Sequence, residues 1–189
     1  MTEHTPVADR PVIVANCSGF FGDRLSAAKE MVEGGPIDVL TGDWLAELTM
    51  LILARQRMKN GPGTGWARTF LRQMEQVLST CQERGIKVVS NAGGLDPAGC
   101  AAALREKADE LGLQDLKIAY VTGDDLMPEL ERLQGDGEKL INMDTGESLE
   151  SLGFSPLTAN AYLGARGITE ALRAGADVVI TGRVTDAAL

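Results

Sequence analysis

Short apolar runs alternate along the chain with longer segments of helical periodicity. The apolar runs that we expect to form strands are residues 12–15, 37–40, 86–89, 118–121 and 178–180. Apart from Asp38 and Lys87, these runs are apolar, and they do not alternate between apolar and polar residues. Because strands of that kind are covered by helices on both faces, the pattern predicts a parallel sheet.

Helices are expected between the strands, over residues 23–33, 43–59, 64–84, 96–111, 124–133 and 156–174. Asp96 and Ser155 each stand before a proline, the arrangement of a capping residue followed by the first helical position. Glycines follow several of the helical segments, as at Gly85. The alternation predicts a doubly wound, mostly parallel α/β fold with three layers and a Rossmann-like architecture.

One stretch departs from this alternation. Residues 137–150 are predicted to form a small β-hairpin inserted at the surface. The domain organisation is then a flexible arm over residues 1–10 and a single α/β domain over residues 11–189. Because the chain ends about one turn into the helix expected after the last strand, we expect it to be the amino-terminal part of a longer protein.

Composition and charge exclude several classes of function. The 189 residues are 44% hydrophobic with a formal net charge of −9, typical of a soluble domain and unsuited to nucleic acid. We find neither an apolar run of about 18 residues nor a signal peptide, so we expect no membrane contact and a cytoplasmic location. The three cysteines have no metal-site spacing, which favours reduced thiols.

The catalytic chemistry of histidine is also unsupported. The one histidine, His4, lies in the polar amino-terminal arm, so a Ser-His-Asp triad, a Cys-His pair and a histidine-ligated zinc site are not indicated. Neither a phosphate loop nor a strand-following GxGxxG motif is present. A nucleoside triphosphate or dinucleotide therefore has no direct support.

Polar residues and glycines follow the predicted strands. In a parallel sheet these loops meet at the carboxyl edge, where glycines admit a ligand close to the backbone and helix N–H groups hold an anion. A small anionic metabolite or an acyl thioester fits such a site. The residues predicted to bind this substrate are Asn16, Ser18, Gly19, Asp23, Arg24, Gly42, Asn91, Gly93, Gly94, Gly182 and Arg183.

Three carboxylates are candidate catalytic groups. Asp43 and Glu47 are one helical turn apart, and two carboxylates that converge near a cleft can differ in pKa and share acid and base roles. Asp186 shares a loop with Arg183, and the two form either a stiffening ion pair or a substrate clamp. Oxygen ligands of this kind also suit a divalent cation, with Mg²⁺ as the possible cofactor, although no metal-ligand set is identified.

Structural explanations compete with several of these roles. Asp96 and Asp124 are better explained as helix caps than as chemical groups. Cys17 follows the first strand, but without a histidine to activate it a packed thiol is favoured. Trp66 follows the glycine-rich residues 61–65, which could form a lid, or it packs on the sheet.

Five segments together resemble a known family, the acyclic terpene utilisation protein AtuA family. They are residues 16–24, 38–47, 91–97, 158–165 and 175–189, and the match runs from Pro11 onward. Asn160 joins the predicted substrate-binding residues through the fourth of these motifs. The resemblance implies a role in bacterial catabolism of acyclic terpenoids such as citronellol and geraniol, alongside acyl-CoA carboxylase and hydratase steps.

Two functions follow as hypotheses. In the first, the protein is an enzyme that acts on a branched acyl-CoA or carboxylate metabolite in a lyase- or hydratase-type step. In the second, it is a non-catalytic ligand-binding or scaffold subunit that partners acyl-CoA enzymes. A homo-oligomer or an association with such enzymes is expected in either case.

Overall fold

The fold is built on one five-stranded parallel sheet, seen in a computed structural model that describes residues 10–189. The strands are β1 (Val14–Asn16), β2 (Val39–Gly42), β3 (Lys87–Ser90), β4 (Ile118–Val121) and β5 (Val178–Thr181). Their order is β1-β2-β3-β5-β4, and every neighbouring pair is parallel. The predicted α/β fold class is confirmed. His4 and most of the predicted amino-terminal arm lie outside the described residues.

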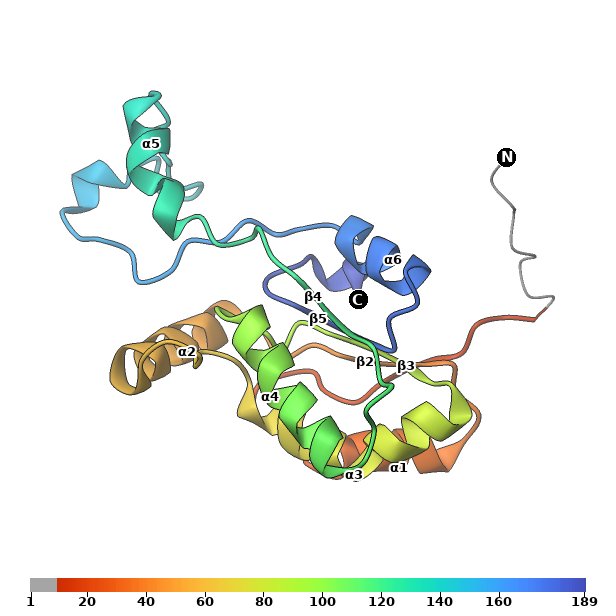
Figure 1. Cartoon of the computed structure of the whole chain (residues 1–189). Coiled ribbons are helices and arrows are strands. Elements are labelled where there is room, and N and C mark those ends of the chain that lie inside the picture. Colours follow the sequence, from red (N-terminus) through yellow and green to blue (C-terminus); the bar gives the residue numbers. More distant parts are fainter. Residues whose placement is uncertain (1–9) are drawn as a thin grey trace.

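Helices cover both faces of the sheet. Helices α1 (Ala27–Gly34), α3 (Arg68–Arg84) and α4 (Pro97–Glu110) pack side by side on one face, and α6 (Arg166–Arg173) covers the other (Figure 1). Two clusters of buried apolar side chains fill the layers. Large members of the first are Leu40, Phe70 and Leu104, and the second contains Val179 and Ile168. Burial on both faces explains why the middle of β3, Val88–Val89, and most of β5, Val178–Ile180, are apolar.

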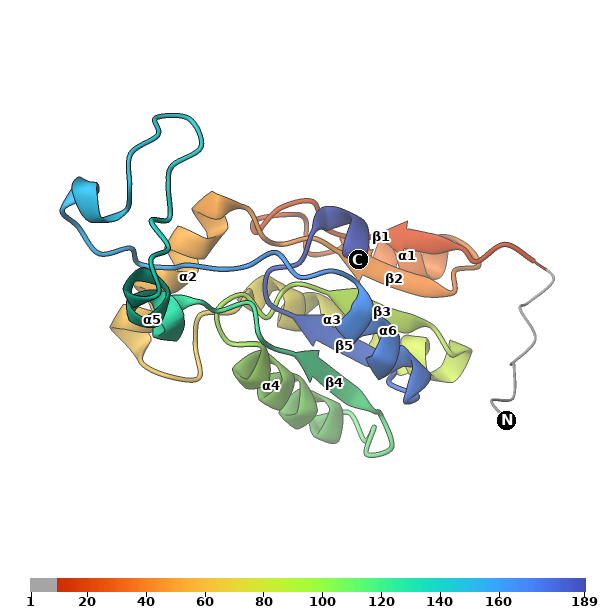
Figure 2. The ribbon, with the colours of Figure 1, turned by 90° about the horizontal axis from the view of Figure 1, so that it is seen from above.

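Two helices lie beyond the carboxyl edge of the sheet. They are α2 (Glu47–Asn60) and α5 (Leu130–Gly135), which stand on the side toward which the strand arrows point (Figure 2). Short 3-10 helices occur at Met127–Glu129 (η1), Glu150–Leu152 (η2) and Asp186–Ala188 (η3). The loops that follow the strands therefore share one side of the molecule with α2 and α5.

Some helix boundaries agree with the sequence, whereas others begin later than expected. Asp96 caps α4 by accepting a hydrogen bond from the Gly99 N–H at 2.8 Å, and Gly85 ends α3 in the left-handed conformation with a φ of 69°. Helix α2 begins at Glu47 and not at residue 43, because the Asp43 carboxylate accepts from the Leu45 N–H at 3.0 Å and holds a turn before the helix.

The helix predicted over residues 156–174 is wrong in its first half, and Ser155 does not cap it. Residues 158–163 are extended because their backbone groups bond to other segments: the Ala161 N–H to the Asp124 carbonyl at 2.8 Å, and the Thr185 N–H to the Leu163 carbonyl at 2.9 Å. These bonds replace the intrahelical ones, and the helix begins at Arg166.

The predicted hairpin at residues 137–150 is present as a chain reversal with little strand structure. One isolated antiparallel bridge joins Ile141 to Ser148, and the Asn142 N–H donates to the Glu147 carbonyl at 2.8 Å. The Asn142 side chain accepts from the N–H groups of Asp144 and Thr145, which fixes the turn. We call residues 126–159, which leave the sheet and return to it, the excursion.

The cysteines and Trp66 belong to the packed interior. Cys17, Cys81 and Cys100 are buried and unpaired, and burial raises the pKa of Cys17 to about 12 and that of Cys81 to about 11. The prediction of a packed Cys17 thiol is confirmed. Trp66 is 7% exposed and donates its Nε1–H to the Gly63 carbonyl at 3.0 Å, so its packed interpretation is also confirmed.

Candidate functional site

Arg183 stands at the carboxyl edge of the sheet, two residues after β5. The backbone there is held by the buried Asp124, whose Oδ2 accepts from the Arg183 N–H at 2.8 Å. The approach is so close that a Cβ atom at Gly182 would lie 2.4 Å from that oxygen, so glycine is required at this position. The loop thereby directs a buried arginine, 4% exposed, toward the start of α2.

The guanidinium group of Arg183 is surrounded by contacts from two other segments. Nη1 donates to the Leu45 carbonyl at 2.6 Å, and Nη2 lies 3.5 Å from Oε1 of Glu47. The group stacks over the Tyr162 ring, 4.0 Å from its centroid, and the Tyr162 hydroxyl donates to Glu47 Oε1. A cavity of about 150 Å³ opens here, lined by Glu47, Met50, Thr158, Asn160, Tyr162 and Arg183. We call it the arginine pocket.

The charges of this pocket follow from its contacts. The Tyr162 hydroxyl and the nearby Arg183 lower the pKa of Glu47, and the hydrogen bond to Glu47 raises the pKa of Tyr162. At neutral pH the carboxyl group is therefore ionised and the phenol keeps its proton. Behind the pocket, burial raises the pKa of Asp124 against the hydrogen bonds from Arg183 and Asn160.

Of the three predicted catalytic carboxylates, the structure places one in the arginine pocket, Glu47. Asp186 is exposed in η3 and forms no ion pair with Arg183, so the predicted ion pair between them is wrong; the carboxylate partner of Arg183 is Glu47. The cap predicted at Asp124 is also wrong, because its carboxylate is occupied by the Arg183 N–H and the Asn160 amide at 3.0 Å.

Asp43 belongs to a second polar cluster, around Asn91. The buried Asn91 amide donates to Asp43 Oδ1 at 2.5 Å and accepts from the Trp44 N–H at 2.8 Å. The Asp43 N–H in turn donates to the Ser18 carbonyl at 2.9 Å. The cluster joins the loops that follow β1, β2 and β3, and it uses the Asn91 amide for the protein's own structure.

The end of β1 and the loop after it carry five predicted binding residues, and their polar groups bond mainly to one another. Asn16 accepts from the Ser18 N–H at 3.2 Å, and Asp23 accepts from the Gly19 N–H at 3.0 Å, which with the Arg24 N–H lowers the pKa of Asp23. Arg24 pairs with Glu30 at 2.7 Å. None of the five lines the arginine pocket.

The other predicted glycines accommodate the protein's own atoms. A Cβ atom would lie 2.2 Å from the Trp44 ring at Gly42, 2.6 Å from the Thr181 carbonyl oxygen at Gly93, and 2.4 Å from Leu53 Cδ1 at Gly94. Close packing of strand-end loops thus accounts for these three glycines.

Sequence reasoning missed Tyr162 and the supporting role of Asp124. A signal for Tyr162 was available, because Asn160 and Tyr162 are two residues apart and share one side of an extended segment. In the helix that was predicted there, Asn160 and Tyr162 would point to different faces. Asp124 follows a strand like the other predicted carboxylates, and its pairing depends on a long-range contact that local pattern does not reveal.

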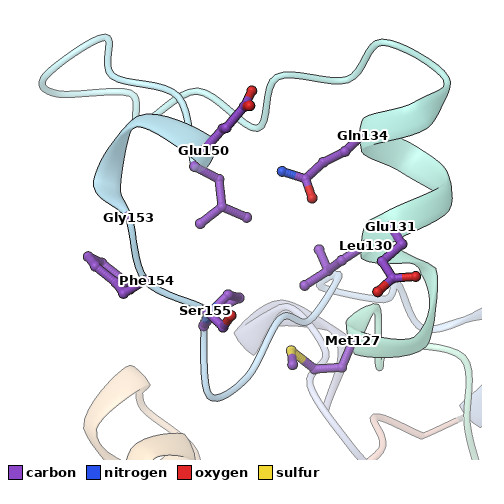
Figure 3. Close-up of a pocket in the computed structure, with 10 residues that line it drawn as sticks. Met127, Leu130, Glu131, Gln134, Glu150, Gly153, Phe154 and Ser155 are labelled. Atoms are coloured by element: carbon purple, nitrogen blue, oxygen red, sulfur yellow. The ribbon is translucent and has the colours of Figure 1, made fainter.

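A larger hollow lies within the excursion, about 470 Å³ in volume, between α5 and the segment around η2 (Figure 3). It contains none of the predicted site residues, and its polar side chains, Glu131, Gln134, Glu150 and Ser155, are exposed. We therefore place the candidate site at the smaller arginine pocket, where a buried cation converges with an acid and a phenol.

Two further findings concern the described part of the chain. Within residues 10–189, no three histidine, cysteine or carboxylate side chains gather in a way that would hold a metal ion. None of the helices found there has the length and apolar character needed to cross a membrane.

The open parallel sheet and the polar pocket at its carboxyl edge define a three-layer α/β protein of the kind that binds ligands where the strands end. A family model described as acyclic terpene utilisation family protein AtuA matches residues 12–189. The chain therefore belongs to this family, and the resemblance seen in the five sequence motifs is confirmed. No curated protein and no solved structure matches the chain.

Proposed function

We propose that this protein binds the carboxylate or thioester end of a branched acyclic terpenoid, as the free acid or the acyl-CoA, in the arginine pocket and catalyses a lyase- or hydratase-type step there. The family name points to acyclic terpene utilisation. The observation that carries the proposal is the buried Arg183, whose carboxylate partner Glu47 has a side chain that is 83% exposed.

The ion pair between Arg183 and Glu47 is open to exchange. It rests on one 3.5 Å contact, and a pair with one exposed partner contributes at most about 1 kcal/mol. A ligand carboxylate that accepts two parallel N–H bonds from the guanidinium gains more than this single contact provides. An anionic substrate can thus take the place of Glu47 beside Arg183.

Pocket size indicates which part of the ligand is held. The volume of about 150 Å³ is below the roughly 300 to 1,000 Å³ of sites that enclose a whole small molecule. The pocket accommodates a head group, and the hydrocarbon chain extends beyond it. Recognition at this site then concerns the carboxylate or carbonyl group and the carbons next to it.

The pocket also supplies a base and an acid. Glu47 is ionised at neutral pH and can accept a proton from a carbon next to the carbonyl group or from water. The Tyr162 hydroxyl can donate to an oxygen that becomes negative, with Arg183 stabilising the same charge. These roles replace those expected for Asp43 and Asp186, which lie outside the pocket.

Binding is tested by thermal shift and calorimetry with terpenoid acids, branched acyl-CoA thioesters and free CoA. Arg183→Lys keeps the charge but loses the planar fork, and we expect at least a tenfold loss of affinity. Arg173→Lys, an exposed arginine on α6, is the matched control and should bind as the original protein does. If both variants bound the ligand with equal affinity, Arg183 would not be a binding residue.

Catalysis is tested separately with Glu47→Gln, an exposed position whose substitution leaves the packing intact. We expect turnover to be lost while a carboxylate ligand binds several-fold more tightly, because the competing negative charge is gone. Tyr162→Phe should bind normally and turn over slowly. Weaker binding by Glu47→Gln would contradict the exchange of Glu47 for substrate.

A second candidate is a non-catalytic subunit that partners acyl-CoA enzymes, and the excursion favours it. The excursion contains seven carboxylates and two basic residues, and Met143, Phe154 and Ile141 are 99%, 63% and 55% exposed. Such a surface suits a partner with a basic face. Ligand binding by the protein without turnover, together with a stable complex with an acyl-CoA carboxylase, would favour this function.

A further inference from the structure

One part of the chain is basic, although the protein as a whole is acidic. Between Glu47 and Glu75 there is no carboxylate, although the formal net charge of the whole protein is −9. The basic residues of this interval are Arg55, Arg57, Lys59, Arg68 and Arg72. The interval covers α2, the glycine-rich loop after it and the start of α3.

Part of this basic interval surrounds a cavity of about 430 Å³, which we call the basic pocket. Its lining consists of Ile52, Arg55, Gln56, Lys59, Asn60 and Arg68. Arg55 and Lys59 are four residues apart on α2 and therefore stand on the same face of that helix. Arg68, the first residue of α3, adds a third cation from across the loop.

Among the residues that the structure describes, no carboxylate neutralises these cations. Arg55, Lys59 and Arg68 form no ion pair within residues 10–189, whereas Lys107, for example, pairs with both Glu75 and Glu110. Gln56 and Asn60 contribute amide N–H donors, and Ile52 provides one apolar wall. The pocket thus combines three unneutralised cations with neutral hydrogen-bond donors.

Helix α3 adds to the positive potential. It is 17 residues long, and its first turn contains neither a capping side chain nor an acidic residue. The amino-terminal end of such a helix carries a partial positive charge. Lys59 also stabilises the carboxyl-terminal end of α2 through the helix dipole, but this explanation does not extend to Arg55 or Arg68.

We propose that the basic pocket binds a multiply charged phosphate ligand, with a diphosphate group as the recognised unit. Its volume lies within the range of sites that hold small molecules. Arginine forks and a lysine point charge are the groups that proteins use for phosphate oxygens. The basic pocket shares no residue with the arginine pocket, so a test of diphosphate binding does not depend on whether the proposed function is correct.

Isothermal titration calorimetry with inorganic diphosphate tests the proposal, using the whole chain at near-physiological salt. The single variants Arg55→Gln, Lys59→Gln and Arg68→Gln should each weaken binding at least fivefold, and the triple variant should abolish it. All three residues are exposed, so the variants should keep the original unfolding temperature. ADP in a second series distinguishes a nucleotide ligand, which would bind more tightly than diphosphate, from recognition of the phosphates alone.

The matched control is the double variant Arg57→Gln with Arg72→Gln. It removes two charges from the same basic interval but none from the pocket lining, and it should bind diphosphate within twofold of the original protein. An equal loss in this control would show that diffuse charge and not the pocket attracts the anion, which would overturn the proposal. Absence of diphosphate binding at millimolar concentration would also overturn it.

Discussion

Replacing Asn91 by alanine should destabilise the protein strongly, although it removes only one small polar side chain. Asn91 is 1% exposed and is the point at which the loops after β2 and β3 are joined. Its amide accepts from the Trp44 N–H and donates to Asp43 Oδ1, at 2.8 and 2.5 Å. Alanine fills neither role, so the buried Trp44 N–H loses its acceptor.

The size of the effect follows from these two hydrogen bonds. A buried N–H left without a partner costs roughly 1 to 3 kcal/mol, and a hydrogen bond to a carboxylate contributes roughly 1.5 to 3 kcal/mol. Asp43 is half-buried and regains part of its bond from water, so the lower end applies to it. We therefore expect the free energy of unfolding to fall by about 3 kcal/mol, which lowers Tm by about 6 to 12 °C in a domain of this size.

Urea denaturation followed by circular dichroism at pH 7 measures this difference directly. The matched control is Asn16→Ala, another asparagine at a strand end whose one side-chain hydrogen bond, to the Ser18 N–H at 3.2 Å, lies at an exposed position. It should cost less than about 1 kcal/mol. If Asn91→Ala cost no more than this control, the assignment of Asn91 as the joint between the loops would be refuted.

Three further predictions concern packing, acid and thiols. Gly93→Ala should lower the free energy of unfolding, measured by urea denaturation, by about 3 kcal/mol, because the new Cβ would lie 2.6 Å from the Thr181 carbonyl oxygen. Gly34→Ala, at a position with open space around it, should raise that free energy by about 0.5 kcal/mol. Equal effects of the two substitutions would contradict the close packing at Gly93. Hydrogen bonds from Arg10 and the Ile13 N–H lower the pKa of Asp38 to about 2. The original protein should therefore be more stable than Asp38→Asn by a constant amount above about pH 5, and this difference in urea midpoint should shrink between about pH 4 and pH 2. A difference that is unchanged at pH 2 would argue against the ion pair between Arg10 and Asp38. The three buried cysteines should react with a thiol reagent in urea and stay unreactive in the native protein; rapid native labelling would contradict their burial.

The sheet was predictable because its signals are local. Strands such as 178–180 are apolar throughout, and the cap at Asp96 and the end at Gly85 depend on residues within a few positions. Strand order was not predictable, because it depends on which strand pairs with which, and no local pattern records that β5 inserts between β3 and β4.

The candidate site was predictable only in part. Arg183 and Glu47 were found because charged residues stand out near strand ends and helix starts. Their pairing with each other, and not with Asp186, arises from a contact across 136 positions of sequence. Tyr162 was lost for a different reason: helical periodicity around it was overridden by backbone bonds to the strand-end loops.

The excursion enters and leaves the sheet region at a single closed junction. The Leu126 N–H donates to the Ala159 carbonyl at 2.7 Å, the Ala161 N–H donates to the Asp124 carbonyl at 2.8 Å, and a bridge joins Asp125 to Asn160. The chain between these bonds is therefore attached to the rest of the fold only where Asp125 and Asn160 lie side by side. We therefore expect the residues between these bonds to tolerate shortening, lengthening or exchange by recombination without movement of β4 or β5, so the fold carries a replaceable segment that ends beside Thr158 of the arginine pocket.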